Sequence, residues 1–276
     1  MKPKGKTLGR WACQLALAVL IALLFVPGAN AAGKKVWSID VARFGYHVDR
    51  LRTIVRWRGQ YVVIGSSMFV RDEATRQCLP AFDPGQPMLV FDTVTHKQLP
   101  KEVLGSYVQE WEPPRAHRNF YPCEEKGRYE PTAPFITDKL RYNDDYEQHR
   151  FIVTDENWKE KYRIAPGRLG CWGTCVVSNR AGTRFAIMDK GETPLVWLGN
   201  RINTLKDQYD TDKKVIKVYS AQDGKKLFQL SWRENEQAWG PGPDESERVS
   251  FSDDGESLAV LRDDARLQIF RISDDP

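Results

Sequence analysis

The stretch Val249–Ile272, which reads VSFSDDGESLAVLRDDARLQIFRI, decides the fold. It contains three short runs rich in β-branched and aromatic residues, and two tight turns built from Asp, Gly, Ser and Ala separate them. This pattern is typical of antiparallel strands joined by hairpins. The sequence ends soon afterwards, at Pro276, so no later strand is left to pair with the third one.

The first hairpin of this stretch has two further copies in the chain. SFSDDGESLAVLR (250–262) aligns with VSNRAGTRFAIMD (177–189) and with VRWRGQYVVIG (55–65), and one glycine is shared by all three. A tight hairpin needs a residue that adopts a positive φ at little cost, which glycine provides. Asp253 and Asp254 align with Arg180 and Ala181. We therefore interpret the two carboxylates as turn residues and not as an acid–base pair.

A second unit also recurs. VIKVYSAQDGKKLFQL (215–230) aligns with PMLVFDTVTHKQLPKEV (87–103), and the final LQIFRIS matches its first half. Each complete copy is a strand ending in an aromatic residue, a polar turn, a lysine and another strand. The repeat order is therefore strand, glycine turn, strand, spacer, strand, turn, strand.

These residues resemble the blades of WD40-type and YVTN-type β-propellers, whose hairpins read like FSPDGxxLA and IxVYDxxTGKxL. The resemblance implies an all-β, β-propeller-like fold with four-stranded blades. It covers roughly 100 residues and concerns architecture only. No Gly-His pair precedes the blades, and Phe270-Arg271 and Tyr219-Ser220 replace the Trp-Asp dipeptide. The polar network of WD40 blades is therefore not carried over.

The resemblance also explains the missing strand. A propeller often completes one blade from both ends of the chain, which removes an open edge. We expect residues 36–43, from KVWSIDVAR, to pair with LQIFRI. An open or partial propeller is the alternative, because about 40 residues per blade predicts roughly six blades and only three are visible.

The N-terminus has the features of an export signal. Lys2, Lys4, Lys6 and Arg10 precede an apolar run from Trp11 to Val26, and small residues follow. This predicts a signal peptide over residues 1–31 and a single domain over 32–276, located in the periplasm or secreted. A retained membrane anchor is the alternative, although the apolar run is shorter than the roughly 20 residues that span a bilayer.

Removal of this peptide makes the chain neutral. Four of the 41 basic residues leave with it, so 37 remain against 37 acidic residues. Nucleic-acid binding would require a basic surplus. We therefore expect no nucleic-acid partner and no membrane insertion after cleavage.

Four cysteines remain after cleavage, and an even count in an exported chain favours disulfides. We prefer Cys171–Cys175, which lie close together in CWGTC, with Cys78–Cys123. A metal knuckle is the alternative, but the four histidines are isolated from one another and from CWGTC.

Catalytic motifs are not apparent. The sequence contains no G-x-S-x-G, H-E-x-x-H, Walker A or G-x-G-x-x-G pattern. The acidic strings at 142–147, 207–212 and 243–247 lack the spacing of a calcium loop. We expect no catalytic, cofactor or metal residues.

The stretch around 104–170 matches no repeat, so we expect an irregular insertion there. It mixes aromatic residues, arginines and prolines, and Tyr, Trp and Arg are the residues that dominate protein-binding hot spots. Capping of the fold by these aromatics is an equally good interpretation. The candidate partner-binding residues here and in the loop at 231–247 are Trp111, Arg115, Arg118, Tyr121, Tyr142, Trp158 and Trp239.

The sequence thus favours an exported, non-catalytic module that binds a protein partner, for example an immunity or assembly-accessory protein. The alternative is a propeller hydrolase or lactonase with a metal in its central channel. That class needs convergent Glu, Asp, Asn or His residues at strand starts, and the sequence shows no such series.

Overall fold

The computed structural model places all its described residues in one unit, Ala31–Pro276. The residues it describes are 34–48, 53–72, 78–83, 85–108, 120–122, 135–137, 139–145, 150–164, 176–190, 213–233 and 248–272. In this part of the chain no helix is long and apolar enough to cross a bilayer.

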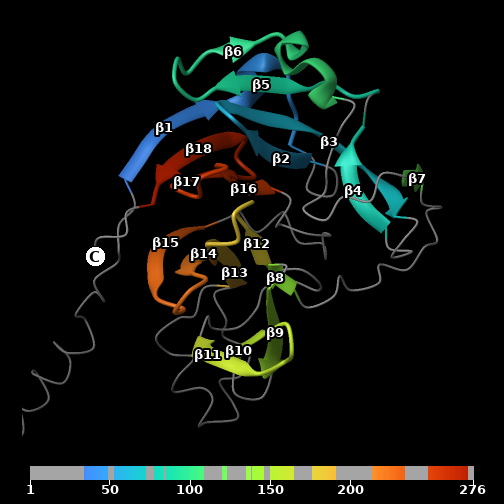
Figure 1. The fold of residues 1–276 in the computed structure, drawn as a ribbon. Helices are drawn as coiled ribbons and strands as arrows, with labels where there is room; N and C mark the ends of the chain where they lie inside the picture. The colour runs from blue at the N-terminus through green and yellow to red at the C-terminus, as the bar shows by residue number, and fades with distance from the viewer. Residues whose placement is uncertain are drawn as a thin grey trace, which may run out of the picture. The chain divides into compact units, whose positions relative to one another are not determined.

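Four antiparallel sheets dominate the structure (Figure 1), and each follows a path of four strands that we call a blade. Blade 1 is β2 (Thr53–Arg58), β3 (Tyr61–Asp72), β5 (Leu89–Asp92) and β6 (Gln98–Leu99). Blade 2 is β8 (Phe135–Thr137), β9 (Leu140–Asp145), β10 (Arg150–Asp155) and β11 (Glu160–Ile164).

Blade 3 is β12 (Val176–Ser178), β13 (Arg184–Lys190), β14 (Lys213–Ser220) and β15 (Lys226–Arg233). Blade 4 is β16 (Val249–Phe251), β17 (Ser257–Leu261), β18 (Arg266–Arg271) and β1 (Lys34–Asp40). Two short 3-10 segments, η1 (Val41–Phe44) and η2 (Lys101–Val108), follow β1 and β6. The fold is all-β and β-propeller-like, with WD40-like blades.

The predicted pairing of the two ends of the domain is confirmed. β1 runs antiparallel to β18, from Lys34 opposite Arg271 to Asp40 opposite Arg266, with a bulge after Lys35. The two strands lie side by side in Figure 1. The structure corrects the predicted range slightly, because the chain leaves the strand after Asp40 and forms η1. Asp40 Oδ1 accepts a hydrogen bond from Ala42 N at 3.0 Å, which starts that turn.

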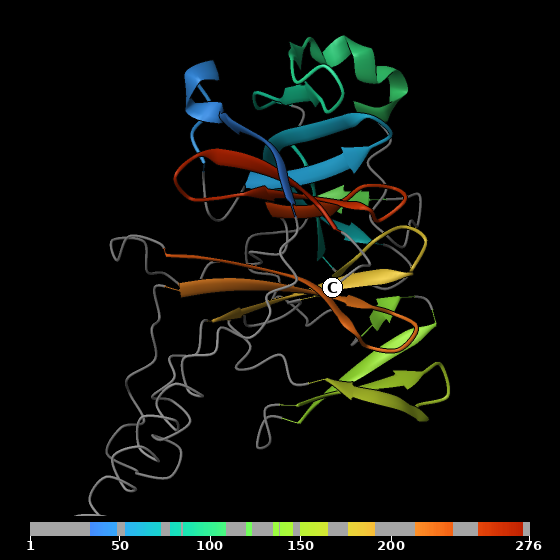
Figure 2. The same ribbon diagram turned by 90° about the vertical axis from the view of Figure 1, so that its left-hand side faces the viewer.

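Two expectations differ from the structure. The stretch around 104–170 is not irregular throughout, because residues 135–164 form the regular hairpins of blade 2 (Figure 2). The described residues also form four blades, whereas chain length predicted about six. Long segments separate some consecutive strands of one blade, as between β13 and β14, so blade 3 takes up more of the chain than the 40 residues assumed.

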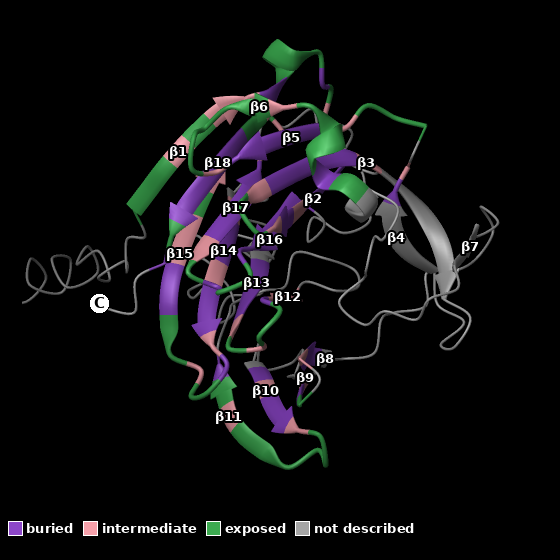
Figure 3. Ribbon diagram, turned by 45° about the horizontal axis from the view of Figure 1, so that its top comes forward, coloured by how far each residue is buried: buried purple, intermediate pink, exposed green. Residues whose placement is uncertain are grey.

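Successive residues of a central strand pack into apolar clusters on opposite faces of the sheet. In β17, Leu258 and Val260 belong to a cluster with blade 3, whereas Ala259 and Leu261 belong to a cluster with blade 1. Successive side chains of a strand point to opposite faces, so a strand covered on both faces is a continuous apolar run. By contrast, the N-terminal strand β1 is largely exposed, whereas β17 is mostly buried (Figure 3).

Three apolar clusters join the blades in pairs. One joins blades 4 and 1, a second joins blades 3 and 4, and a third joins blades 2 and 3. A fourth cluster packs Phe82 of β4 (Cys78–Phe82) and Leu104 of η2 against blade 1. The N-terminal strand contributes Trp37 and Ile39 to the contact between blades 4 and 1.

The first turn of each blade, between its first and second strands, contacts a neighbouring blade. A Cβ built on Gly182 of blade 3 would lie 3.3 Å from Thr137 of blade 2. A Cβ on Gly255 of blade 4 would lie 2.5 Å from Asn179 Nδ2 of blade 3. The amide of Gly59 in blade 1 donates to Asp253 Oδ2 of blade 4 at 3.0 Å. The aligned glycines therefore serve contacts between blades as well as the turns themselves.

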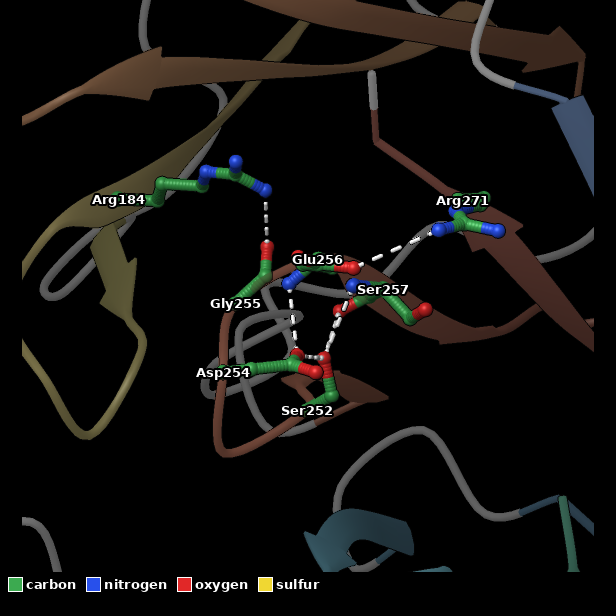
Figure 4. A network of polar contacts seen from close by, with 7 residues as sticks. All are labelled: Arg184, Ser252, Asp254, Gly255, Glu256, Ser257 and Arg271. Carbon is green, nitrogen blue, oxygen red and sulfur yellow. Dashed lines mark hydrogen bonds and ion pairs between the residues drawn. The ribbon is translucent and has the colours of Figure 1, made fainter. Parts of the chain in front are cut away.

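The hairpin that opened the sequence analysis is held by polar contacts (Figure 4). Ser252 Oγ accepts from Ser257 N at 2.9 Å and donates to Asp254 Oδ1 at 2.6 Å. Asp254 Oδ1 also accepts from Glu256 N at 2.8 Å. The hydrogen bond from Ser252 is the main reason why the pKa of Asp254 is lowered. Arg184 of blade 3 donates to Gly255 O at 2.7 Å. These contacts favour the interpretation of both aspartates as turn residues.

Substitution of Trp37 tests the role of β1. Trp37 packs edge-on against Phe91, with ring centroids 5.8 Å apart, whereas Val36 is 49% exposed. Trp37→Ala should lower the free energy of unfolding by about 2 kcal/mol, because it leaves a cavity between blades 4 and 1. Val36→Ala is the matched control and should change it by less than about 0.5 kcal/mol. Urea unfolding measures both, and equal effects would contradict a role for β1 in the core.

Alanine substitution of two aligned glycines tests the contact between blades. Gly59 and Gly255 have φ values of 52° and 77°, so alanine is strained at either position. Gly59→Ala should cost about 1 kcal/mol of unfolding free energy from that strain alone. Gly255→Ala should cost about 1–3 kcal/mol more, because its Cβ meets Asn179. Asn179 is buried and its Oδ1 accepts from the amides of Thr183 and Arg184, so it cannot move aside freely. Equal losses in thermal melts would show that the turns do not depend on one another.

Candidate functional site

The third turn of blade 2, between β10 and β11, carries the exposed Trp158. Asp155 Oδ1 accepts hydrogen bonds from the amides of Asn157 and Lys159, each at 2.9 Å. The amide of Asp155 donates to Lys159 O at 2.9 Å. These bonds close a short turn and place Trp158 in the left-handed region, with a φ of 63°.

The equivalent turns of blades 1 and 3 show how unusual this tryptophan is. In each turn the residue before a lysine has a positive φ: His96 at 60° before Lys97, and Gly224 at 72° before Lys225. The lysine carbonyl accepts the amide of the residue that ends the preceding strand, Asp92 or Ser220, as in blade 2. A side chain in this conformation costs on the order of 1 kcal/mol relative to glycine.

Burial does not compensate for that cost at Trp158. The residue remains 52% exposed, so much of its indole still faces solvent. In blade 1, His96 occupies the same position but stacks on Trp37, with ring centroids 5.2 Å apart and planes 9° apart. In blade 3, Gly224 leaves room for Tyr162 of blade 2. Trp158 therefore keeps a large exposed aromatic surface in a turn where blade 1 has a stacked histidine and blade 3 has a glycine.

Arg141 packs its guanidinium group against the face of the Trp158 ring. Its guanidinium carbon lies 4.9 Å from the ring centroid, a cation–π contact worth about 0.5–1 kcal/mol at an exposed site. Arg141 is in β9, opposite Thr154 of β10. Thr154 is buried, and no hydrogen-bond partner of its Oγ1 is found among the described residues. The arginine orders the indole while leaving much of it accessible.

Tyr142 has a different position from Trp158. Its ring stacks on Phe151 with centroids 4.4 Å apart, and it packs against the cluster that joins blades 2 and 3. The neighbouring Tyr162 donates to Ala221 O of blade 3 at 2.9 Å, and burial is the main reason why its pKa is raised. Of the predicted partner-binding residues, the structure thus places Tyr142 in the core contact and Trp158 at the surface.

The other predicted partner-binding residues are described less fully. Tyr121 lies in β7 (Phe120–Pro122), opposite Arg71 of β3. Trp111, Arg115, Arg118 and Trp239 lie outside the described residues. Sequence reasoning did not select Arg141 as a binding residue, although it precedes Tyr142 directly and is the residue that contacts Trp158.

The predicted disulfides stay predictions. Cys78 begins β4, opposite Arg71 of β3, whereas Cys123, Cys171 and Cys175 lie outside the described residues. β4 and β7 both pair with β3, on its two sides, and β7 ends at Pro122, next to Cys123.

Metal-ligand groups are not found in the described residues. No group of three or more His, Cys, Asp or Glu side chains is placed there to hold an ion. Of the acidic strings, 142–147 falls partly in β9, and the strings at 207–212 and 243–247 lie outside the description.

Comparison with known proteins gives likenesses in structure but none in sequence. No protein family matches the chain, and no curated protein is similar to it in sequence. Among solved structures, a chain of the "Crystal Structure of Mitotic Checkpoint Complex" has a TM-score of 0.24 and 10% sequence identity. The likeness covers 90% of this chain and 94% of that one. At this TM-score it supports no argument about function, and the fold rests on the blades described above.

Two substitutions in blade 2 separate surface from core. Trp158→Gly should change the free energy of unfolding by less than about 1 kcal/mol, because relief of the left-handed strain offsets the lost cation–π contact. Tyr142→Ala should lower it by about 2–3 kcal/mol, because it removes a stacked core ring. Urea unfolding of both variants checks this. A loss at Trp158 as large as that at Tyr142 would mean that the tryptophan is a packing residue.

Proposed function

We propose that the chain is an exported, non-catalytic scaffold that binds a protein partner through blade 2. The observation that carries the proposal is Trp158, which is half exposed, strained at its backbone and held in place by Arg141. Tryptophan and arginine are the residues most enriched in protein-binding hot spots. A rigid, accessible indole loses little conformational entropy when a partner covers it.

The fold suits this role. Turns that connect the strands of a rigid sheet are common positions for binding residues, because the scaffold fixes their geometry. Export rests on the basic and apolar N-terminus, with cleavage after Ala31. The finer form of the proposal is an immunity or assembly-accessory protein whose partner meets it in the cell envelope or outside the cell.

Site-specific photo-crosslinking tests the proposal. A benzophenone amino acid at position 158 should form a crosslinked adduct of discrete mass with a protein of the periplasmic or secreted fraction. The same amino acid at Val94 is the matched control, because Val94 is 73% exposed in the equivalent turn of blade 1. The same fraction should contain the chain with Ala32 at its N-terminus.

The outcomes are distinct. An adduct at position 158 that is missing at position 94 supports binding through blade 2. No adduct at 158, or the same adducts at both positions, would contradict it. Recovery of the chain only in the cytoplasm would contradict export.

A further inference from the structure

The described charged side chains at the end of blade 2 that carries Trp158 differ in whether they have a polar partner. Leu140 lies opposite Asp155, so the turns that carry Lys139 and Lys159 emerge at the same end of the sheet. Lys161 follows two residues later in β11, and all three lysines are exposed. None of the three forms an ion pair within the described part of the chain.

Two of the described carboxylates at this end accept hydrogen bonds from neighbouring groups. Asp155 Oδ1 accepts two amides of its own turn. Glu160 accepts both Nε and Nη2 of Arg163 at 2.8 Å, and this arginine is the main reason why the pKa of Glu160 is lowered. Within the described residues, the exposed Glu156 side chain forms no ion pair or hydrogen bond. The described part of this end holds five basic residues, Lys139, Arg141, Lys159, Lys161 and Arg163, against three acids, Asp155, Glu156 and Glu160. The described surface around Trp158 therefore carries a net positive charge, although the mature chain is neutral overall.

Positive charge around an aromatic side chain defines the chemistry of a partner. Carboxylates of the partner would meet the three ammonium groups, and an apolar side chain would cover the exposed part of the indole. Such charge complementarity speeds association and selects the partner, whereas the aromatic contact contributes most of the affinity.

We infer that Trp158, Lys139, Lys159 and Lys161 form a docking surface for an acidic protein segment that carries an apolar side chain. This inference rests on the proposed function, since it specifies the partner of the same surface. An anionic membrane shares part of this chemistry, but it would not require an indole ordered by an arginine.

Synthetic peptides test the inference on the purified protein. The probe is a fluorescent peptide of Glu and Ser residues with one central Phe, and its binding is followed by anisotropy. One control peptide has Lys in place of Glu, and a second has Ser in place of Phe. The acidic peptide should bind, the basic peptide should not, and the peptide without Phe should bind more weakly. Added salt should weaken binding, because it screens exposed charges.

Equivalent turns provide matched variants. Lys159→Glu should weaken binding of the acidic peptide by about tenfold or more, which is about 1.4 kcal/mol. Lys97→Glu reverses the charge at the same turn position of blade 1, which shares no described apolar cluster with blade 2, and should leave binding within about twofold. Both lysines are exposed, so neither variant disturbs the core, and thermal melts verify this. Trp158→Gly should weaken binding by a similar factor.

Each remaining outcome is decisive. Equal effects of Lys159→Glu and Lys97→Glu, or equal binding of acidic and basic peptides, would overturn the inference. Binding to phosphatidylglycerol vesicles without binding to the acidic peptide would also overturn it and would assign the surface to lipid. If position 158 crosslinks to a protein but no acidic peptide binds, the inference fails and the proposed function stands. If neither occurs, both fail.

Discussion

The pairing of β1 with β18 is the constraint on which the rest of the structure depends. β18 forms hydrogen bonds with β17 on one side, and its other edge would be open without β1. The N-terminal strand closes this edge and brings Trp37 and Ile39 into the core between blades 4 and 1. Residues more than 200 positions apart therefore complete one sheet, and formation of that sheet depends on closing a very long loop.

The contacts between first turns extend this constraint to the other blades. Thr137 and Asn179 lie against the glycine of the neighbouring blade, and Asp253 accepts a hydrogen bond from the amide of Gly59, so three junctions use the same turn position. The third turns also contact their neighbours, as Tyr162 contacts the turn at Gly224 and Trp37 stacks on His96. Trp158 occupies the equivalent turn position in blade 2 but retains an exposed indole. At this position we propose contact with a partner protein, whereas the equivalent turns of blades 1 and 3 contact a neighbouring blade.

Glycine turns and β-branched runs predicted blades 1, 3 and 4 and the role of the N-terminal strand. Blade 2 could not be recognised in this way, for two physical reasons. Thr137 Oγ1 accepts the amides of Lys139 and Leu140, which closes its first turn without glycine. Its third turn is one residue shorter than those of blades 1 and 3 and has Trp158 where blade 1 has His96 and blade 3 has Gly224. The sequence predicted Trp158 as a binding residue. Its contact with Arg141 depends on the register of β9 and β10, which the amino-acid composition of this stretch does not reveal.

Hydrogen exchange of the backbone amides of residues 35–40 tests the account most directly. If β1 completes blade 4, these amides should be protected and should exchange together with those of residues 266–271, because one cooperative opening exposes both strands. Exchange of residues 35–40 at the rate of an unstructured peptide, while residues 266–271 stay protected, would show that β1 is not part of the blade and would contradict the account.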